Sequence, residues 1–187
     1  MSGNFLTAAP LGTINGIDYQ WTGRVRRIHV ERIHNLLGNG DIVILGNLGF
    51  SPFGELYNCS SIEVAAHCAI QLQASKLIFL HEGETLIDSR RGDDSLISNL
   101  SISDAKAFVN SMSPQPSTTT TTTSPKKTST TTTNLNIISN EIHQNLNRTF
   151  RLFLKGGIYA CEKGVKRTHM VSRYQNGGLY IYVYIYT

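Results

Sequence analysis

Hydrophobic residues in the first half of the chain recur with helical and strand spacings in turn. Between Val30 and Leu37 they fall on one helical face, and Gly38-Asn39-Gly40 follows as a helix stop. The uninterrupted apolar run from Ile42 to Leu45 predicts a short strand buried on both faces, as in parallel sheets. A second helix is predicted from Ser61 to Gln73, and a second strand from Lys76 to Leu80. This alternation predicts an α/β fold whose strands pair in parallel through right-handed crossovers.

The same alternation resumes in the second half of the chain. A short helix is predicted from Ser103 to Val109, with Ser101 or Ser103 as its N-cap. The stretch from Leu135 to Lys163 is periodic enough for one long helix, or for two helices broken at Gly156-Gly157. A strand from Val165 to Val171 follows.

A Thr- and Pro-rich tract separates these two parts. Residues 113–134 can bury almost nothing, so they predict a disordered insertion. Because the α/β pattern continues beyond it, we expect the insertion to interrupt a single domain made of residues 1–112 and 135–187. The second of these parts ends in Tyr180 to Tyr186, where four tyrosines alternate with aliphatic residues. That pattern predicts an atypical strand, and one prone to aggregation if its edge is open.

Composition narrows the classes of protein that fit. The 187 residues are 40% hydrophobic, enough for one core. The net charge is +4, but Lys126 and Lys127 of the insertion supply two of these charges, so nucleic-acid binding has little support. No apolar run approaches the roughly 20 residues of a membrane span. The first residues contain neither a secretory signal nor an organelle leader, which predicts a cytoplasmic protein.

The residues capable of chemistry are few. Cys59, Cys68 and Cys161 form no CxxC pair and are expected to be reduced and mostly buried. The six histidines show no paired metal spacing, so no metal site is predicted. The arginine-rich stretch from Gly23 to Arg27 fits either a solvated face or a surface for an acidic ligand or partner.

A glycine-rich loop from Gly46 to Glu55 is the best candidate for ligand binding by position. It follows the predicted buried strand, where α/β proteins bind anions and small molecules through backbone N–H groups. It lacks both a Walker lysine and the GxGxxG spacing. The pattern therefore leaves open a ligand role for Gly46 and Gly49 or a plain structural turn.

Motifs spread over both parts of the chain resemble those of N-acetylglutamate synthases. The similar segments are Gly3 to Ala8, Gly16 to Ile28, Gly46 to Ser51, Gly54 to Cys59, Glu63 to Ala65, Ala74 to Ile78 and Ala160 to Met170. They lie within roughly residues 3–112 and 148–179, and the Asn58-Cys59 pair is most similar to the plant and algal branch. The resemblance implies an amino-acid kinase-like fold, a three-layer αβα structure with a mainly parallel sheet, here incomplete.

The resemblance also implies a function. Enzymes of this family acetylate glutamate with acetyl-CoA in arginine biosynthesis, and the kinase-like domain is often their regulatory part. This chain would be that part of a parent enzyme, with the first kinase lobe expected before residue 1 and the acetyltransferase domain after residue 187. No cofactor is expected in the chain itself and acetyl-CoA is expected in the parent. The expected partners are arginine as effector and glutamate in the parent, with a homo-oligomer allowed and no nucleic acid or membrane. An upstream transit peptide would direct it to a plastid.

The resemblance assigns roles to individual residues and also shows departures. It implies ligand binding at Gly46, Gly49, Asn58 and Ser60, effector binding at His169, and no catalytic residue. Ile62 stands where acetylglutamate kinases carry a catalytic aspartate, and Tyr182 stands where the family's effector-binding glutamate is expected. Two alternatives remain beside the synthase fragment: an ATP-dependent amino-acid kinase of the acetylglutamate kinase type, and a non-catalytic interaction protein.

Overall fold

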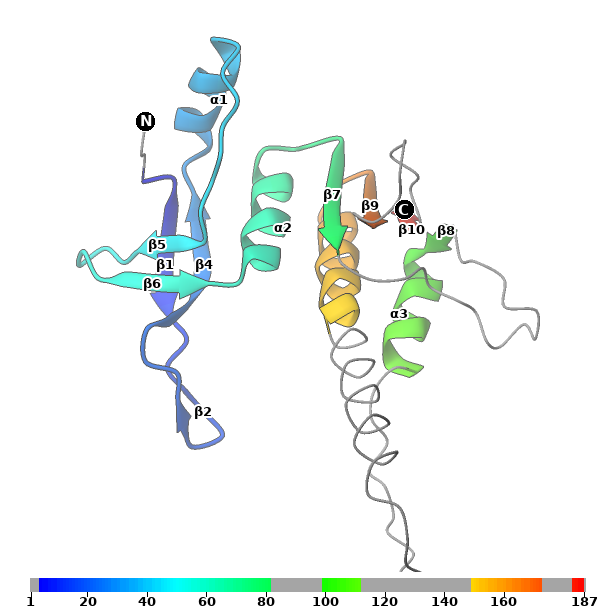
Figure 1. Cartoon of the computed structure of the whole chain (residues 1–187), viewed down its shortest axis with the longest axis horizontal. Helices are drawn as coiled ribbons and strands as arrows, with labels where there is room; N and C mark the ends of the chain where they lie inside the picture. Colours follow the sequence, from blue (N-terminus) through cyan, green and yellow to red (C-terminus); the bar gives the residue numbers. More distant parts are fainter. Residues whose placement is uncertain (1–3, 82–98, 112–148, 173–182, 187) are drawn as a thin grey trace, which may run out of the picture.

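The structure, a computed structural model, describes residues 4–81, 99–111, 149–172 and 183–186. The predicted insertion at 113–134 and the effector position Tyr182 lie outside the described residues. A β-barrel built from the first sixty residues lies on one side of helix α2 (Ser61–Gln71), and a four-stranded sheet lies on the other (Figure 1).

The barrel is closed by four short strands in the order β1-β4-β6-β5. Their bounds are β1 Leu6–Pro10, β4 Thr22–Ile28, β5 Leu48–Phe50 and β6 Leu56–Cys59. A barrel of so few strands encloses little space, so small residues point inward: Ala8 has no exposed surface, and Gly23 and Gly49 lie against the side chains of neighbouring strands. The glycine-rich loop expected after residue 46 is therefore largely the β5–β6 hairpin.

Two further elements flank the barrel. Strands β2 (Thr13–Ile14) and β3 (Ile17–Asp18) form a hairpin whose turn residues, Asn15 and Gly16, both have positive φ, as a tight Asn-Gly turn requires. Helix α1 (Val30–Gly38) confirms the first predicted helix.

The strand predicted from Ile42 to Leu45 does not form. This segment pairs with no strand in the described part of the chain, and the barrel is closed by β1 and β5 without it. Val43 and Leu45 pack against the barrel core, whereas Ile42 is 91% exposed and Ile44 is 88% exposed. Burial on both faces, which the apolar run predicted, is therefore wrong for this segment.

The second sheet has the order β7-β9-β10-β8. Its strands are β7 Lys76–His81, β8 Asn99–Ser101, β9 Arg167–Ser172 and β10 Val183–Tyr186. The β7–β9 and β10–β8 pairs are parallel and β9–β10 is antiparallel, so the α/β class is confirmed with mixed sheets. The described end of the tyrosine segment is an inner strand with fully buried Ile185, and both of its edges are paired.

Two helices pack on this sheet. Helix α3 (Ile102–Ser111) is capped by Ser101, whose Oγ accepts a hydrogen bond from the Asp104 backbone N–H at 3.1 Å and donates one to Asp104 Oδ2 at 2.7 Å. The helix of residues 149–162 runs without interruption through Gly156-Gly157, so of the two alternatives the break at these glycines is wrong. These glycines lie where the helix closely approaches Ile62 and Thr168.

Helix α2 joins the two cores. One side, including Ala66 and Ala69, packs into the sheet core, and the other side, including Val64, packs into the barrel core. Two of its side chains also bond to β4: the Val25 N–H donates to Glu63 Oε1 at 2.9 Å, and the Ile28 N–H donates to Gln71 Oε1 at 3.0 Å. The β4–β6 pairing is short, and these bonds satisfy amides of β4 that lie beyond it. They thereby hold the barrel against α2.

Candidate functional site

Three of the sequence-predicted site residues lie together where β6 leads into α2. Gly46 is exposed and precedes Asn47, whose Nδ2 donates a hydrogen bond to Asn58 Oδ1 at 2.7 Å. The Cys59 backbone N–H donates to the Asn47 carbonyl at 2.8 Å, which ties the loop to β6. Ser60 follows as the N-cap of α2. The structure thus brings Gly46, Asn58 and Ser60 to one end of the barrel.

The amino end of α2 keeps part of its hydrogen-bonding capacity. Ser60 has extended backbone angles (φ −64°, ψ 127°), and its side chain makes no capping bond. The first backbone N–H groups of a helix have no partner within the helix and favour anionic or polar ligands. Glu63 carries a negative charge in this first turn, but one of its oxygens accepts the bond from Val25. The arrangement can contact a small polar group through backbone and amide atoms.

Gly49 does not face this cluster. It is buried in β5, and a Cβ added there would lie 2.7 Å from Ala8 Cβ and 3.0 Å from Leu6 Cγ. The close approach of β5 to β1 inside the barrel thus accounts for this glycine. By contrast, a Cβ added at Gly46 would meet nothing within 4 Å.

The turn between β5 and β6 is organised by buried Ser51. Its Oγ accepts hydrogen bonds from the backbone N–H groups of Phe53 and Glu55, at 3.3 and 3.2 Å. The Tyr57 hydroxyl donates to Glu55 Oε2 at 2.8 Å, and this bond raises the pKa of the phenol. Together these bonds fix the hairpin that delivers Asn58 to the start of α2.

The three cysteines are free thiols, as predicted. Burial raises the pKa of each thiol, to about 11 for Cys68, and the charge of Glu63 adds to the effect at Cys59. They are therefore protonated near neutral pH and are poor nucleophiles. In the described part of the chain, no group of three metal-ligating side chains comes together.

His169, the predicted effector residue, lies in the other sheet. It is buried on β9, where its neighbours in register are Ile78 of β7 and Tyr184 of β10. The residues before and after it, Thr168 and Met170, are fully buried on the face that the 149–162 helix covers, so His169 faces the opposite side. Burial, then the positive charges of Lys76 and Arg167, lower its pKa.

Acidification should destabilise the chain through His169. A histidine of the unfolded chain titrates near pH 6.5, whereas His169 has a lower pKa when folded. At pH values between the two pKa values, the unfolded state therefore binds more protons than the folded state. The contribution of His169 to the free energy of unfolding is complete above pH 6.5, and it is lost as the pH falls through 6.5 toward the pKa of the folded state. In urea unfolding, we expect the wild type to lose more stability between about pH 7.5 and about pH 5.5 than His169→Gln. Equal losses would contradict this.

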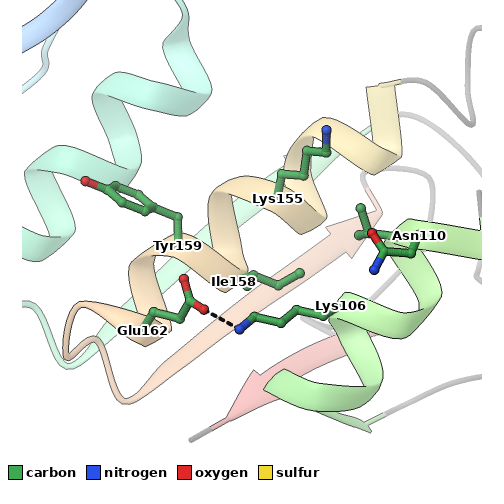
Figure 2. A pocket seen from close by; sticks show the side chains of 7 residues that line it. Lys106, Asn110, Lys155, Ile158, Tyr159 and Glu162 are labelled. Carbon is green, nitrogen blue, oxygen red and sulfur yellow. Dashed lines mark ion pairs between the residues drawn. The ribbon is translucent and has the colours of Figure 1, made fainter. Parts of the chain in front are cut away.

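A groove that the sequence did not reveal lies between α3 and the 149–162 helix (Figure 2). Its volume is about 300 Å³, and it is lined by Lys106, Val109, Asn110, Lys155, Ile158, Tyr159 and Glu162. Lys106 Nζ pairs with Glu162 Oε1 at 2.6 Å, whereas Lys155 extends away from this pair (Figure 2). The only sequence signal was helical spacing on both segments, which does not show that the two faces meet.

Comparisons with known proteins show which family and which relatives the chain is similar to. The amino acid kinase family matches residues 1–131. An amino-acid acetyltransferase of Yersinia enterocolitica is 34% identical over 179 residues, which are 96% of this chain and 34% of that protein. N-acetylglutamate synthase of Neisseria gonorrhoeae complexed with coenzyme A and N-acetyl-glutamate covers the whole chain with 25% identity and a TM-score of 0.73.

A second structure of the Neisseria gonorrhoeae synthase, complexed with coenzyme A and L-arginine, gives 24% identity and a TM-score of 0.70. In both structures the match takes up 37% of the synthase chain. The present chain thus spans about a third of the length of the relatives that it matches. Among its described residues, no helix is long and apolar enough to cross a membrane.

Proposed function

This chain belongs to the amino acid kinase family, and from that membership we propose that it is the kinase-like part of a glutamate N-acetyltransferase of arginine biosynthesis. The observation that carries the proposal is similarity to an amino-acid acetyltransferase over 96% of the chain. The parent enzyme would transfer the acetyl group of acetyl-CoA to glutamate. This part would serve regulation and assembly, in the cytoplasm, or in a plastid where a transit peptide precedes it.

The start of α2 supports a regulatory role over phosphoryl transfer. Ile62, at the position where the resemblance places a kinase aspartate, packs against the sheet core, and a Cβ on Gly156 would lie 2.6 Å from its Cγ2. An apolar side chain held there cannot orient a lysine or a metal ion. The remaining polar groups, Asn47, Asn58 and Ser60, can bind a small molecule without activating it.

Arginine is the effector that we propose for the parent enzyme. A guanidinium ligand is best held by a carboxylate in a bidentate pair. The phenol of Tyr182 cannot form that pair, and burial lowers the pKa of His169, which favours its neutral form. We therefore expect arginine to bind this chain more weakly than micromolar, which calorimetry can measure. A micromolar signal would contradict the assignment of Tyr182 to the effector position.

The proposal is tested on the protein as it occurs in its own cells. An antibody raised against this chain should recognise a polypeptide about three times its length, in keeping with its share of the relatives. Depletion with that antibody should remove the activity that forms N-acetylglutamate from acetyl-CoA and glutamate, whereas an unrelated antibody should not. A single species of 20.7 kDa whose removal leaves that activity intact would overturn the proposal. ATP-dependent phosphorylation of N-acetylglutamate by the purified chain would favour the kinase alternative.

A further inference from the structure

Strand β4 carries three arginines on the outer surface of the barrel. Gly23, Val25 and Ile28 are buried and face inward, whereas Arg24, Arg26 and Arg27 are exposed; we call these three the arginine row. Strict alternation would have pointed Arg27 inward. It lies outside because the register with β1 shifts at this point.

The shift is a β-bulge at Arg26. On β1, Thr7 lies opposite Arg27 while the next residue, Ala8, lies opposite Val25, so Arg26 has no partner on β1. A bulge places one extra residue in a strand and re-aims the side chains around it. Here the extra residue brings two consecutive guanidinium groups to the same face as Arg24.

No acidic side chain among the described residues forms an ion pair with the arginine row. The ion pair found in the described part of the chain, Lys106–Glu162, is in the other half of the molecule. The β1 residues opposite Arg24 and Arg27 are Ala9 and Thr7, which are short and uncharged. The carboxylate of Glu63 instead contacts the Val25 backbone N–H. Within the described residues, three guanidinium groups without an ion pair thus lie along one strand.

We propose that the arginine row is a docking surface for an extended acidic segment of a partner protein. Residues two apart on a strand are separated by about 7 Å, so carboxylates at alternate positions of an extended partner match the repeat from Arg24 to Arg26. Guanidinium forks pair bidentately with carboxylates. Because α2 side chains already bond β4 amides, the partner docks through side chains on the outer face.

The geometry favours a protein partner over single-stranded nucleic acid. Proteins that bind single-stranded nucleic acid combine basic residues with aromatic side chains on which the bases stack. The neighbours of the row on β1, Thr7 and Ala9, provide none. Exposed Trp21, just before β4, packs instead against Tyr57, with 6.2 Å between the ring centroids.

Binding of labelled peptides to the whole chain tests the proposal. The probe is a fluorescein-labelled peptide of four Glu-Thr repeats, compared with the same peptide carrying Gln in place of Glu and with a labelled oligothymidine. The variant Arg24→Gln/Arg26→Gln/Arg27→Gln removes the row. The charge-matched control Lys155→Gln/Lys163→Gln/Lys166→Gln removes three exposed cations from the other half of the molecule.

We expect the acidic peptide to bind the wild type and the lysine control alike, and to bind the arginine variant at least tenfold more weakly. Raising the salt from about 20 mM to about 200 mM should weaken binding. All three substitutions are exposed, and the single variant Arg26→Gln, with an intermediate loss, provides the same test if the triple variant misfolds. Equal weakening in the lysine control, no binding of the acidic peptide, or tighter binding of oligothymidine would each overturn the proposal.

Discussion

Gly157→Ala should destabilise the chain by about 1–2 kcal/mol, although alanine is the better helix former. In an open helix, glycine to alanine gains about 1 kcal/mol. At Gly157 the added Cβ would lie 2.9 Å from Thr168 Cγ2 and 3.1 Å from Ile185 Cδ1, and both of these side chains are fully buried. Overpacking of this kind costs about 1–3 kcal/mol, and more where the neighbours cannot move. We expect the free-energy cost of this overlap to exceed the gain in helix propensity.

A glycine in another helix, α1, provides the control for this result. Gly38 is the last residue of α1, and a Cβ there meets nothing within 4 Å. Gly38→Ala should therefore be neutral or stabilising in the same urea titration. Stabilisation of both variants would show that the 149–162 helix does not approach β9 as closely as described.

The elements that the sequence predicted correctly are those with a clear hydrophobic period. Helices α1, α2 and α3 each combine an apolar face with a terminating or capping signal, and strand β7 is a short apolar run in which buried and exposed residues alternate. The predicted kinship with N-acetylglutamate synthases is likewise confirmed by the relatives, because its motifs are spread along the whole chain.

The barrel was not predicted because its strands do not show the alternating hydrophobic pattern by which strands are found in a sequence. Its strands are short, and inward positions such as Ala8, Gly23 and Gly49 are small because the interior has no room for larger side chains. Glycines at those positions suggest turns when only the sequence is considered. Strand pairing between distant segments, which makes the sheets mixed, also leaves no trace in local periodicity.

For the candidate site, the sequence identified the residues but did not show that one of them, Gly49, lies apart from the others. Gly46, Asn58 and Ser60 were predicted as ligand-binding together with Gly49, and the first three do lie at the start of α2. A linear motif cannot show that Gly49, nine residues before Asn58, faces the barrel interior. Its role as a ligand-binding residue remains a prediction, and its packing role can be measured separately.

Substituting the two glycines of that loop should separate packing from binding. Gly49→Ala should lower the free energy of unfolding by about 2–3 kcal/mol, because its Cβ would overlap Ala8 and Leu6, whose side chains are 0% and 4% exposed. Gly46→Ala should be neutral or stabilising by about 0.5 kcal/mol, because its surroundings are open and alanine restricts the unfolded chain. Urea unfolding of both variants measures these effects.

The same two variants, compared in ligand binding, distinguish a binding role from a packing role for each glycine. If Gly46 lets a small molecule approach the amino end of α2, Gly46→Ala should weaken binding while stability is kept, because the added methyl group would occupy open space next to Asn47, whose side chain bonds to Asn58. Gly49→Ala should lower stability first and binding only as a consequence. Wild-type stability of Gly49→Ala would mean that the four barrel strands are packed less closely than the structure shows, and that this glycine is kept for a reason other than space.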